Sequence, residues 1–370
     1  MANKIKFNNG KLKIMHITDT HLDKDLIDRS VWLIEQACDR ESPDVVTVTG
    51  DNVTNQDNAE ITKGYISRLM NVFESRNIPV AVTFGNHDSE VGAMSRKELM
   101  DFYNTYTCSL SNDETSPESG TYNIPVMSSD DSEIKFNLWI FDSGDYDKEG
   151  HYGCVTKKLV DWYKNTSDAL TKENNGQKVY SLAFQHIIVP EVYDALKKVK
   201  RRKLFSFSHM YNKKDFYTFD PAVKNFGTFN ETPCCGYENF GQFEAMVEKG
   251  DVLAIFSGHD HTNAFGVKHK GIDIVNSLST RYTGDEFSTQ YGYRIIEIDE
   301  SCTSEYTSRV EHWFNMFSFK DVLSFKSDTD NFAYKTAFRV KILGLIQKFY
   351  TQGGRFGAAI LTGRKISYKD

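Results

Sequence analysis

Short groups of Asp, Asn and His follow five separate apolar runs in this 370-residue chain. In chain order the groups read "DTH", "GDN", "GNHD", "QH" and "GHDH". Their side chains are types that bind metal ions and move protons. Any single group is also what a turn prefers, but five such groups in one chain favour a shared site. The candidate residues are Asp19, His21, Asp51, Asn86, His87, Asp88, His186, His259 and His261.

Strands are expected immediately before these groups, because the apolar runs are short and rich in β-branched residues. The runs are Leu12–Thr18, Val45–Thr49, Pro79–Phe84, Val179–Phe184 and Val252–Ser257. Stretches with helical periodicity separate most of the runs, which predicts an α/β fold with both sheet faces covered. Two later runs, Gly271–Asn276 and Tyr291–Ile298, have no helix between them, so a mixed sheet is expected. Ligands of such folds lie beyond the carboxyl ends of the strands, where the five groups should meet.

Two of the groups place their ligands two residues apart. In an extended segment such residues point to the same side, so Asp19 with His21, and His259 with His261, can hold one ion or two neighbouring ions. Imidazole, carboxylate and amide donors together suit Mn, Fe or Zn better than Ca. The ligands outnumber the needs of one ion, so we expect two ions that share a carboxylate. Such a pair, ~3.5–4 Å apart, serves in-line displacement at phosphorus.

The ordered set of five motifs, over roughly residues 11–300, resembles the calcineurin-like metallophosphoesterase superfamily. The resemblance implies a four-layer αββα sandwich with mixed sheets. It implies that Asp51 bridges the two metal ions. The first ion would be held by Asp19, His21, Asp51 and His261. The second ion would be held by Asp51, Asn86, His186 and His259.

His87 remains without a metal in this scheme. The resemblance implies that it lies beside the phosphate, as a general acid or a stabiliser of the transition state, with Asp88 orienting its ring. The chemistry is consistent with this role, because a metal-bridging hydroxide would supply the nucleophile and leave a proton donor to be provided. The chain is similar to purple-acid-phosphatase-like phosphoesterases that lack a tyrosine ligand, since Thr54 occupies that position and His21 is present. The stretch "LWIFDSGDY" adds to this similarity, and its Asp142 and Asp145 are either rim contacts or turn residues.

Three functions are compatible with these residues. The leading one is a metal-dependent phosphoric ester hydrolase acting on phosphomonoesters. The second is a phosphodiesterase acting on cyclic nucleotides or nucleic-acid ends, because the same metal pair serves both reactions. The third is a non-catalytic metal-binding scaffold, since a fold alone does not establish an activity.

Composition favours a compact protein, with 39% hydrophobic and 26% charged residues. The 6 cysteines show no C-x-x-C pair, which predicts free thiols, and the N-terminal region shows neither a signal peptide nor a membrane span. We therefore expect a cytoplasmic protein. A catalytic domain is expected over residues 1–300, with an insertion at about 197–237 and a C-terminal extension over 301–370.

Two basic segments lie outside the motifs. Residues 197–214 hold eight Lys and Arg and no acid, interleaved with aromatic residues. This segment could attract a phosphate substrate, bind single-stranded nucleic acid or be a solvated loop, and we expect no obligate nucleic acid. In the C-terminal stretch the apolar residues recur at helical spacing among lysines, which predicts a helix that packs on the domain or lies on anionic lipid. Those residues are Phe338, Ile342, Leu345, Ile346 and Phe349.

Overall fold

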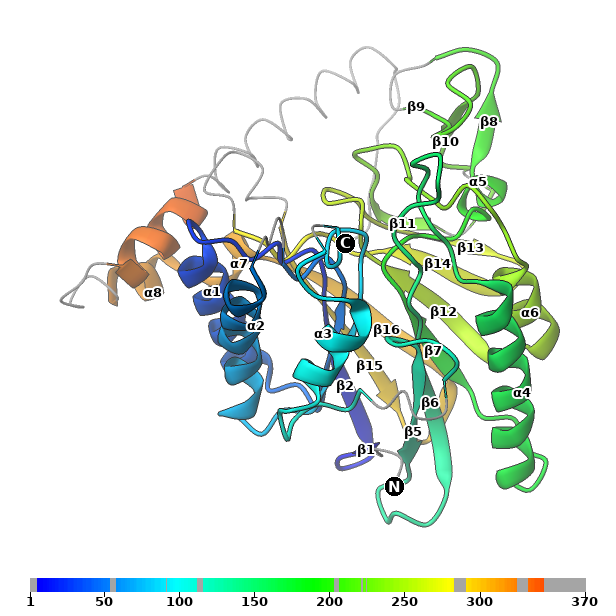
Figure 1. The fold of residues 1–370 in the computed structure, drawn as a ribbon, viewed down its shortest axis with the longest axis horizontal. Helices are drawn as coiled ribbons and strands as arrows, with labels where there is room; N and C mark the ends of the chain where they lie inside the picture. The colour runs from blue at the N-terminus through cyan, green and yellow to red at the C-terminus, as the bar shows by residue number, and fades with distance from the viewer. Residues whose placement is uncertain are drawn as a thin grey trace.

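Two mixed β-sheets lie against each other at the centre of the fold, with helices on the outer side of each (Figure 1). The computed structural model describes residues 5–53, 58–90, 92–111, 116–202, 206–220, 222–223, 225–282, 291–324 and 332–342. The four layers run helix, sheet, sheet, helix, and the expected α/β fold is confirmed.

The first sheet has five strands in the order β16-β15-β2-β3-β4. Its parallel part is β2 to β4, while β15 and β16 are added antiparallel beside β2. Every residue of β3 is buried, as is typical of a central strand covered on both faces. The strands are β2 (Lys11–Ile17), β3 (Val45–Thr49), β4 (Val80–Thr83), β15 (Gly292–Asp299) and β16 (Cys302–His312).

The second sheet has eight strands in the order β1-β5-β6-β7-β12-β14-β13-β11. Its centre, β6 to β14, is parallel, and antiparallel pairs flank it on both sides. The strands are β1 (Ile5–Lys6), β5 (Tyr122–Met127), β6 (Ile134–Ile140), β7 (Ser181–Phe184), β11 (Asn225–Thr228), β12 (Val252–Ser257), β13 (Ala264–His269) and β14 (Ile272–Asn276).

Helices cover the two outer faces. In Figure 1 α1, α2 and α3 lie on the side of the five-stranded sheet, and α4 and α6 lie on the side of the eight-stranded sheet. Three of the helix starts are capped by side chains: Asn58 caps α2, Ser95 and Glu98 form a capping box on α3, and the hydroxyl of Thr156 caps α4. The helices are α1 (Ile27–Glu41), α2 (Ala59–Glu74), α3 (Arg96–Tyr103), α4 (Lys157–Glu173) and α6 (Gln242–Lys249).

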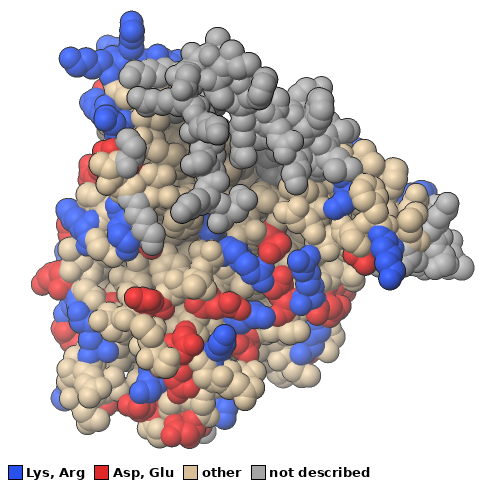
Figure 2. All heavy atoms as spheres, turned by 180° about the vertical axis from the view of Figure 1, so that it is seen from behind, with Lys and Arg blue, Asp and Glu red and all other residues tan. Residues whose placement is uncertain are grey.

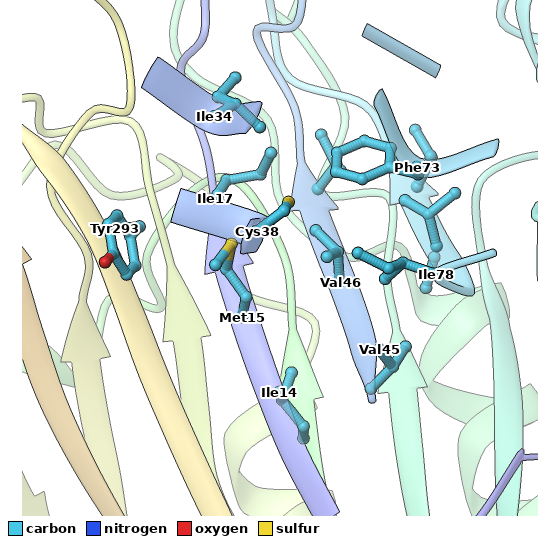
Figure 3. Close-up of a cluster of buried hydrophobic side chains, with 14 of the residues drawn as sticks. Ile14, Met15, Ile17, Ile34, Cys38, Val45, Val46, Phe73, Ile78 and Tyr293 are labelled. Carbon is cyan, nitrogen blue, oxygen red and sulfur yellow. The ribbon is translucent and has the colours of Figure 1, made fainter. Parts of the chain in front are cut away.

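The core beneath the first helical layer joins strands and helices that are distant in sequence. Figure 3 shows Met15 and Ile17 of β2 and Val46 of β3 beside Cys38 of α1 and Phe73 of α2. All five side chains are almost fully buried. This packing holds β2 and β3 in place, and these two strands lead directly into two of the candidate ligand groups.

The insertion forms a small three-stranded sheet in the order β8-β10-β9, seen at the upper right of Figure 1. The short helix α5 precedes it, and β11 after it joins the eight-stranded sheet. The bounds are α5 (Val192–Ala195), β8 (Lys197–Val199), β9 (Phe207–Ser208) and β10 (Phe216–Thr218).

The C-terminal region begins inside the first sheet. The domain boundary expected at residue 300 falls in the turn between β15 and β16, so the sheet continues to residue 312. Beyond β16 lie the short helices α7 (Trp313–Met316) and α8 (Phe319–Ser324), and residues 332–342 are helical. No helix within the described ranges is both long and apolar enough to cross a membrane.

The helix over residues 332–342 packs on the domain, but through a different face from the expected one. Ala337 and Val340 are buried in the main core, while Phe338 is 43% exposed. The sequence pattern favoured large apolar side chains such as Phe338 for this contact, whereas the smaller Ala337 and Val340 let the helix approach the core closely. Leu345, Ile346 and Phe349 lie outside the described residues.

Candidate metal centre

All five predicted ligand groups lie directly after strands. Asp19 follows β2, Asp51 follows β3 and Asn86 follows β4, all in the five-stranded sheet. His186 and His259 follow β7 and β12, which are neighbours in the eight-stranded sheet. The structure brings these strand ends together, so that six of the seven predicted metal ligands form two adjoining clusters.

The first cluster consists of Asp19, His21 and His261. The Oδ1 atom of Asp19 lies 3.4 Å from Nε2 of His261 and 3.8 Å from Nε2 of His21. The two Nε2 atoms of His21 and His261 are only 2.9 Å apart. Two imidazole lone pairs at that distance repel each other unless a proton or a cation lies between them, so the cluster has the character of a cation site.

The second cluster consists of Asp51, His186 and His259. His186 donates from Nδ1 to the carbonyl oxygen of Thr49 at 2.8 Å, which leaves its Nε2 facing Asp51. A histidine ligand of a metal is typically held in this way, with the other ring nitrogen bonded to a carbonyl or carboxylate. Asn86 is fully buried and stands in the chain between Gly85 and His87, both of which pack against Asp51.

Asp51 stands between the two clusters. Its Oδ2 atom is 3.2 Å from Nε2 of His186 and 3.7 Å from Nε2 of His21. Its Oδ1 atom accepts a hydrogen bond from the backbone amide of His87 at 2.9 Å. One carboxylate therefore faces histidines from both clusters, which is the arrangement that a bridging ligand needs.

Besides Oδ1 of Asn52, four buried nitrogen or oxygen atoms of this region have no hydrogen-bond partner among the described residues. They are Oδ1 of Asp19, Oδ1 of Asn86, Nε2 of His186 and Nε2 of His259. Buried polar atoms without partners are rare, because each costs about 1–3 kcal/mol in lost solvation. All four belong to predicted ligands. The donor set therefore fits a transition-metal pair, and a bound ion would satisfy each of these atoms.

The protonation of the histidines agrees with this fit. Burial lowers the pKa of His21 to about 4 and that of His259 to about 3, so both rings are neutral and able to bind a metal near pH 7. Burial also acts against a charge on His186, but the carboxylates of Asp51 and Asp19 raise its pKa to about 10. Carboxylates that attract a proton this strongly attract a metal cation at the same place.

The backbone at the ligands is strained. Four non-glycine ligands have left-handed backbone conformations, with φ of 53° at Asp19, 41° at His21, 51° at Asp51 and 69° at His259. Such conformations cost free energy and persist where the surrounding structure imposes them, most often at functional sites. Left-handed residues thus follow β2, β3 and β12, where they turn the chain sharply toward the two clusters.

Gly85 in "GNHD" is required for close packing. A Cβ atom at Gly85 would lie 2.2 Å from Oδ1 of Asp51 and 2.5 Å from the backbone nitrogen of that residue. The loops after β3 and β4 therefore touch, and any side chain at Gly85 would displace the carboxylate of Asp51.

Asp88 does not orient His87, contrary to the expectation. Its carboxylate accepts hydrogen bonds from the backbone amides of Gly85, Asp51, Asn52 and Val53. The imidazole Nδ1 of His87 instead contacts a carboxylate oxygen of Glu90 at 2.5 Å. A single buried carboxylate is better placed to tie two loops together than to reach a ring at the rim, so Asp88 positions the ligands.

His87 itself lies at the rim of the first cluster. Its side chain is 32% exposed, and its ring centre is 5.7 Å from that of His21. It is thus accessible to a substrate and makes no contact that would identify it as a ligand. His16, by contrast, is buried between the hydroxyls of Ser277 and Thr49 and serves the core.

Three residues of the site were not identified from the sequence: Glu90, Arg96 and Tyr146. Arg96 donates to Asp142 at 2.7 Å and to the carbonyl oxygen of Gly85 at 2.9 Å. It thereby connects "GNHD" to "FDSGDY", whose aspartates were already candidates for rim contacts. Nothing in the sequence around Arg96 or Glu90 signals these roles, and Thr54 lies outside the described residues.

Comparison with known proteins agrees with the geometry. Residues 12–263 match the family model for calcineurin-like phosphoesterases. Two relatives from Arabidopsis thaliana are named "Probable inactive purple acid phosphatase 29" and "Probable inactive purple acid phosphatase 14". The first is 26% identical over 73% of this chain and 72% of its own length. The second is 25% identical over 76% of this chain and 73% of its own length.

A dimetal phosphatase from Danio rerio has a similar fold, with a TM-score of 0.50 at 11% identity. The match covers 81% of this chain and 98% of that structure. Because the family model spans well over half of the sequence and includes all the strand-end motifs, the chain belongs to the calcineurin-like phosphoesterase family.

Proposed function

We propose that this protein is a phosphomonoesterase that works with two transition-metal ions, Mn, Fe or Zn, at the centre around Asp51. The observation that carries the proposal is the set of four buried, unpartnered donor atoms on predicted ligands. Names of the relatives that contain the word phosphatase favour monoesters over diesters.

The metal ions would activate a water molecule and neutralise the charge of a phosphate group. The first ion would be held by Asp19, His21, Asp51 and His261, and the second by Asp51, Asn86, His186 and His259. The chain itself supplies the shape of the site and a proton donor. His87 lies beside the first cluster, is partly exposed and is held at Nδ1 by Glu90. This leaves Nε2 to donate a proton to the leaving oxygen or to stabilise the charge that develops there.

The basic insertion would assist substrate binding through its charge. Exposed Lys197, Lys198 and Lys200 lie in or beside β8, and Arg201 and Arg202 follow. Figure 2 shows Lys and Arg gathered on the projection at the upper left of that view. Within the insertion, Tyr211 accepts a hydrogen bond from the backbone amide of Tyr152, whose ring contacts His259. The insertion is thus joined to the wall of the metal centre.

A non-catalytic metal-binding scaffold is the second candidate, because the two Arabidopsis relatives carry the words "probable inactive" in their names. The scaffold and the enzyme predict the same ligands and differ only in turnover. The seven ligands and the exposed His87 favour the enzyme, since metal binding alone would not need a partly exposed histidine beside the centre.

The test is hydrolysis by metal-stripped protein after addition of Mn, Zn or Fe. An aryl phosphate and a bis-aryl phosphate should be compared, with bound metal measured in the same samples. We expect two ions per chain and faster turnover of the monoester. Faster turnover of the diester would favour a phosphodiesterase. Two bound ions without turnover of either substrate would favour the scaffold.

A further inference from the structure

Tyr146 lies at the edge of the metal centre, in the stretch "FDSGDY" that the ligand scheme leaves without a role. Its hydroxyl oxygen is 2.7 Å from Nδ2 of Asn86. The Oδ1 atom of the same asparagine is the one that is buried without a partner. Tyr146 therefore contacts a predicted ligand directly, on the side away from its metal-binding oxygen.

The hydroxyl of Tyr146 has a proton left to donate. An amide nitrogen can only donate, so the hydroxyl oxygen is the acceptor in the bond with Asn86. A phenol can accept one hydrogen bond and donate another, and no residue in the described part of the chain accepts the proton of Tyr146. The side chain is 37% exposed, so a molecule entering from solvent can reach it.

The loop holds this tyrosine in place from two sides. The backbone amide of Asp147 donates to His151 and that of Gly153 donates to Asp145, which closes a hairpin across residues 145–153. Tyr146 and Tyr152 are opposite each other in this hairpin, with ring centres 5.6 Å apart. The ring of Tyr152 in turn meets the ring of His259 edge-on at 4.3 Å. Both tyrosines thus border the second cluster.

We propose that the hydroxyl of Tyr146 donates a hydrogen bond to a phosphoryl oxygen of the substrate. The inference rests on the proposed function, because it assigns a residue of that same site. Tyr146 contacts Asn86, and His87 follows Asn86 directly in the chain, so both donors border the same metal centre. Tyr146 would hold the phosphate, while His87 would act at the leaving oxygen. No bond other than a hydrogen bond is formed by the tyrosine.

The variant Tyr146→Phe removes the hydroxyl and keeps the ring. Tyr237→Phe is the matched control, because Tyr237 is 56% exposed and contacts His151 and Tyr211 rather than a ligand. Both variants and the wild type, reconstituted with Mn, are compared in kcat/KM for an aryl phosphate, in the Kd of inorganic phosphate by calorimetry, and in bound metal.

We expect Tyr146→Phe to lower kcat/KM and weaken phosphate binding by about tenfold or more, as for the loss of a hydrogen bond to a charged group, with two ions still bound. Tyr237→Phe should match the wild type. Unchanged kcat/KM and Kd in an active protein would overturn this inference alone. Loss of metal in Tyr146→Phe would overturn it as well, since the tyrosine would then act only by positioning Asn86. A wild type that neither turns over nor binds phosphate would overturn the proposed function and this inference together.

Discussion

The two sheets contribute different chemistry to the metal centre. The loops of the five-stranded sheet carry the carboxylates of Asp19 and Asp51, the amide of Asn86 and one imidazole, that of His21. The loops of the eight-stranded sheet carry imidazoles alone. Each cluster draws ligands from both sheets, so neither sheet could bind an ion tightly by itself. The packing of one sheet on the other is therefore part of the site.

Hydrogen bonds between the loops of the two sheets hold the sheets in this relative position. His186 of the eight-stranded sheet donates to the carbonyl oxygen of Thr49, which ends β3 in the other sheet. The backbone amide of His259 donates to a carboxylate oxygen of Asp19 at 3.0 Å. The loops of the five-stranded sheet, which carry the carboxylates, thus hold the histidines of the eight-stranded sheet in position. Substitutions in the two sets of loops should therefore have different effects.

The largest effect is expected at the shared ligand. Asp51→Asn keeps the shape of the side chain but removes the charge that faces both clusters, so both ions and all turnover should be lost. Bound metal and aryl phosphate hydrolysis are the measurements. Asp147→Asn is the control, because Asp147 lies near Glu149 and His151 in a third group of possible ligands, yet its carboxylate already accepts hydrogen bonds from both of their backbones. Two ions retained in Asp51→Asn would refute the bridging role.

His87→Ala tests whether a loop of the five-stranded sheet also supplies the proton donor. General acid catalysis is worth roughly 10²–10⁴-fold, so kcat should fall by that order while two ions remain bound. The loss should be smaller for an ester with a good leaving group, which needs no proton. Release of metal by this variant would show instead that His87 is a ligand.

Metal binding by the histidines of the eight-stranded sheet should depend on pH. In the metal-free protein the neighbouring carboxylates raise the pKa of His186 to about 10, so this ring holds a proton at pH 7 and must lose it to bind a metal. Metal binding should therefore release at least one proton, and affinity should rise about tenfold per pH unit between pH 7 and 9. Calorimetry in buffers of different ionisation enthalpy measures the release. An affinity independent of pH over this range would contradict the assignment.

Substitutions of Asp88 and Glu90 should distinguish a residue that positions the ligands from a residue that acts on His87. Asp88→Asn removes the charge that accepts from backbone amides of both loops, which should lower the free energy of unfolding by about 1–3 kcal/mol. Glu90→Gln should leave stability nearly unchanged, because Glu90 is 40% exposed, and should shift the pH profile of kcat through His87. Denaturant unfolding and pH profiles measure the two effects. A shifted pH profile without loss of stability in Asp88→Asn would restore the role originally expected for Asp88.

The smallest effect is expected from the basic insertion. Charges on an exposed surface are screened within about 8 Å at physiological ionic strength, so KM for a phosphate ester should rise modestly with salt. Replacing Lys197, Lys198 and Lys200 by Gln should flatten that rise without changing kcat. A KM that is independent of salt in the wild type would show that the insertion does not attract the substrate.

Much of the site was predictable because each group of candidate ligands can be recognised from the residues just before it in the sequence. Asp19, Asp51, Asn86, His186 and His259 each follow a short apolar run, and the carboxyl ends of parallel strands in one sheet share an edge. The packing of the two sheets then brings the edge that carries Asp19, Asp51 and Asn86 against the edge that carries the histidines. The structure places six of the seven predicted ligands in the two clusters, and Asn86 stands between Gly85 and His87, which both pack against Asp51. The function of Asp88 was not predictable in this way, since proximity in sequence to His87 suggested a contact that the backbone amides of another loop prevent.

The amino-acid sequence showed which residue types follow which strands, and this was enough to recognise the family and to predict a set of ligands. The packing of the loops showed which carboxylate holds His87, why Gly85 must lack a side chain, and where Arg96 and Tyr146 lie. Hydrophobic periodicity and strand ends carry information only about a residue's own segment. The hydrogen bonds that Glu90 and Tyr146 accept and that Arg96 donates depend instead on how the loops fold and pack against one another.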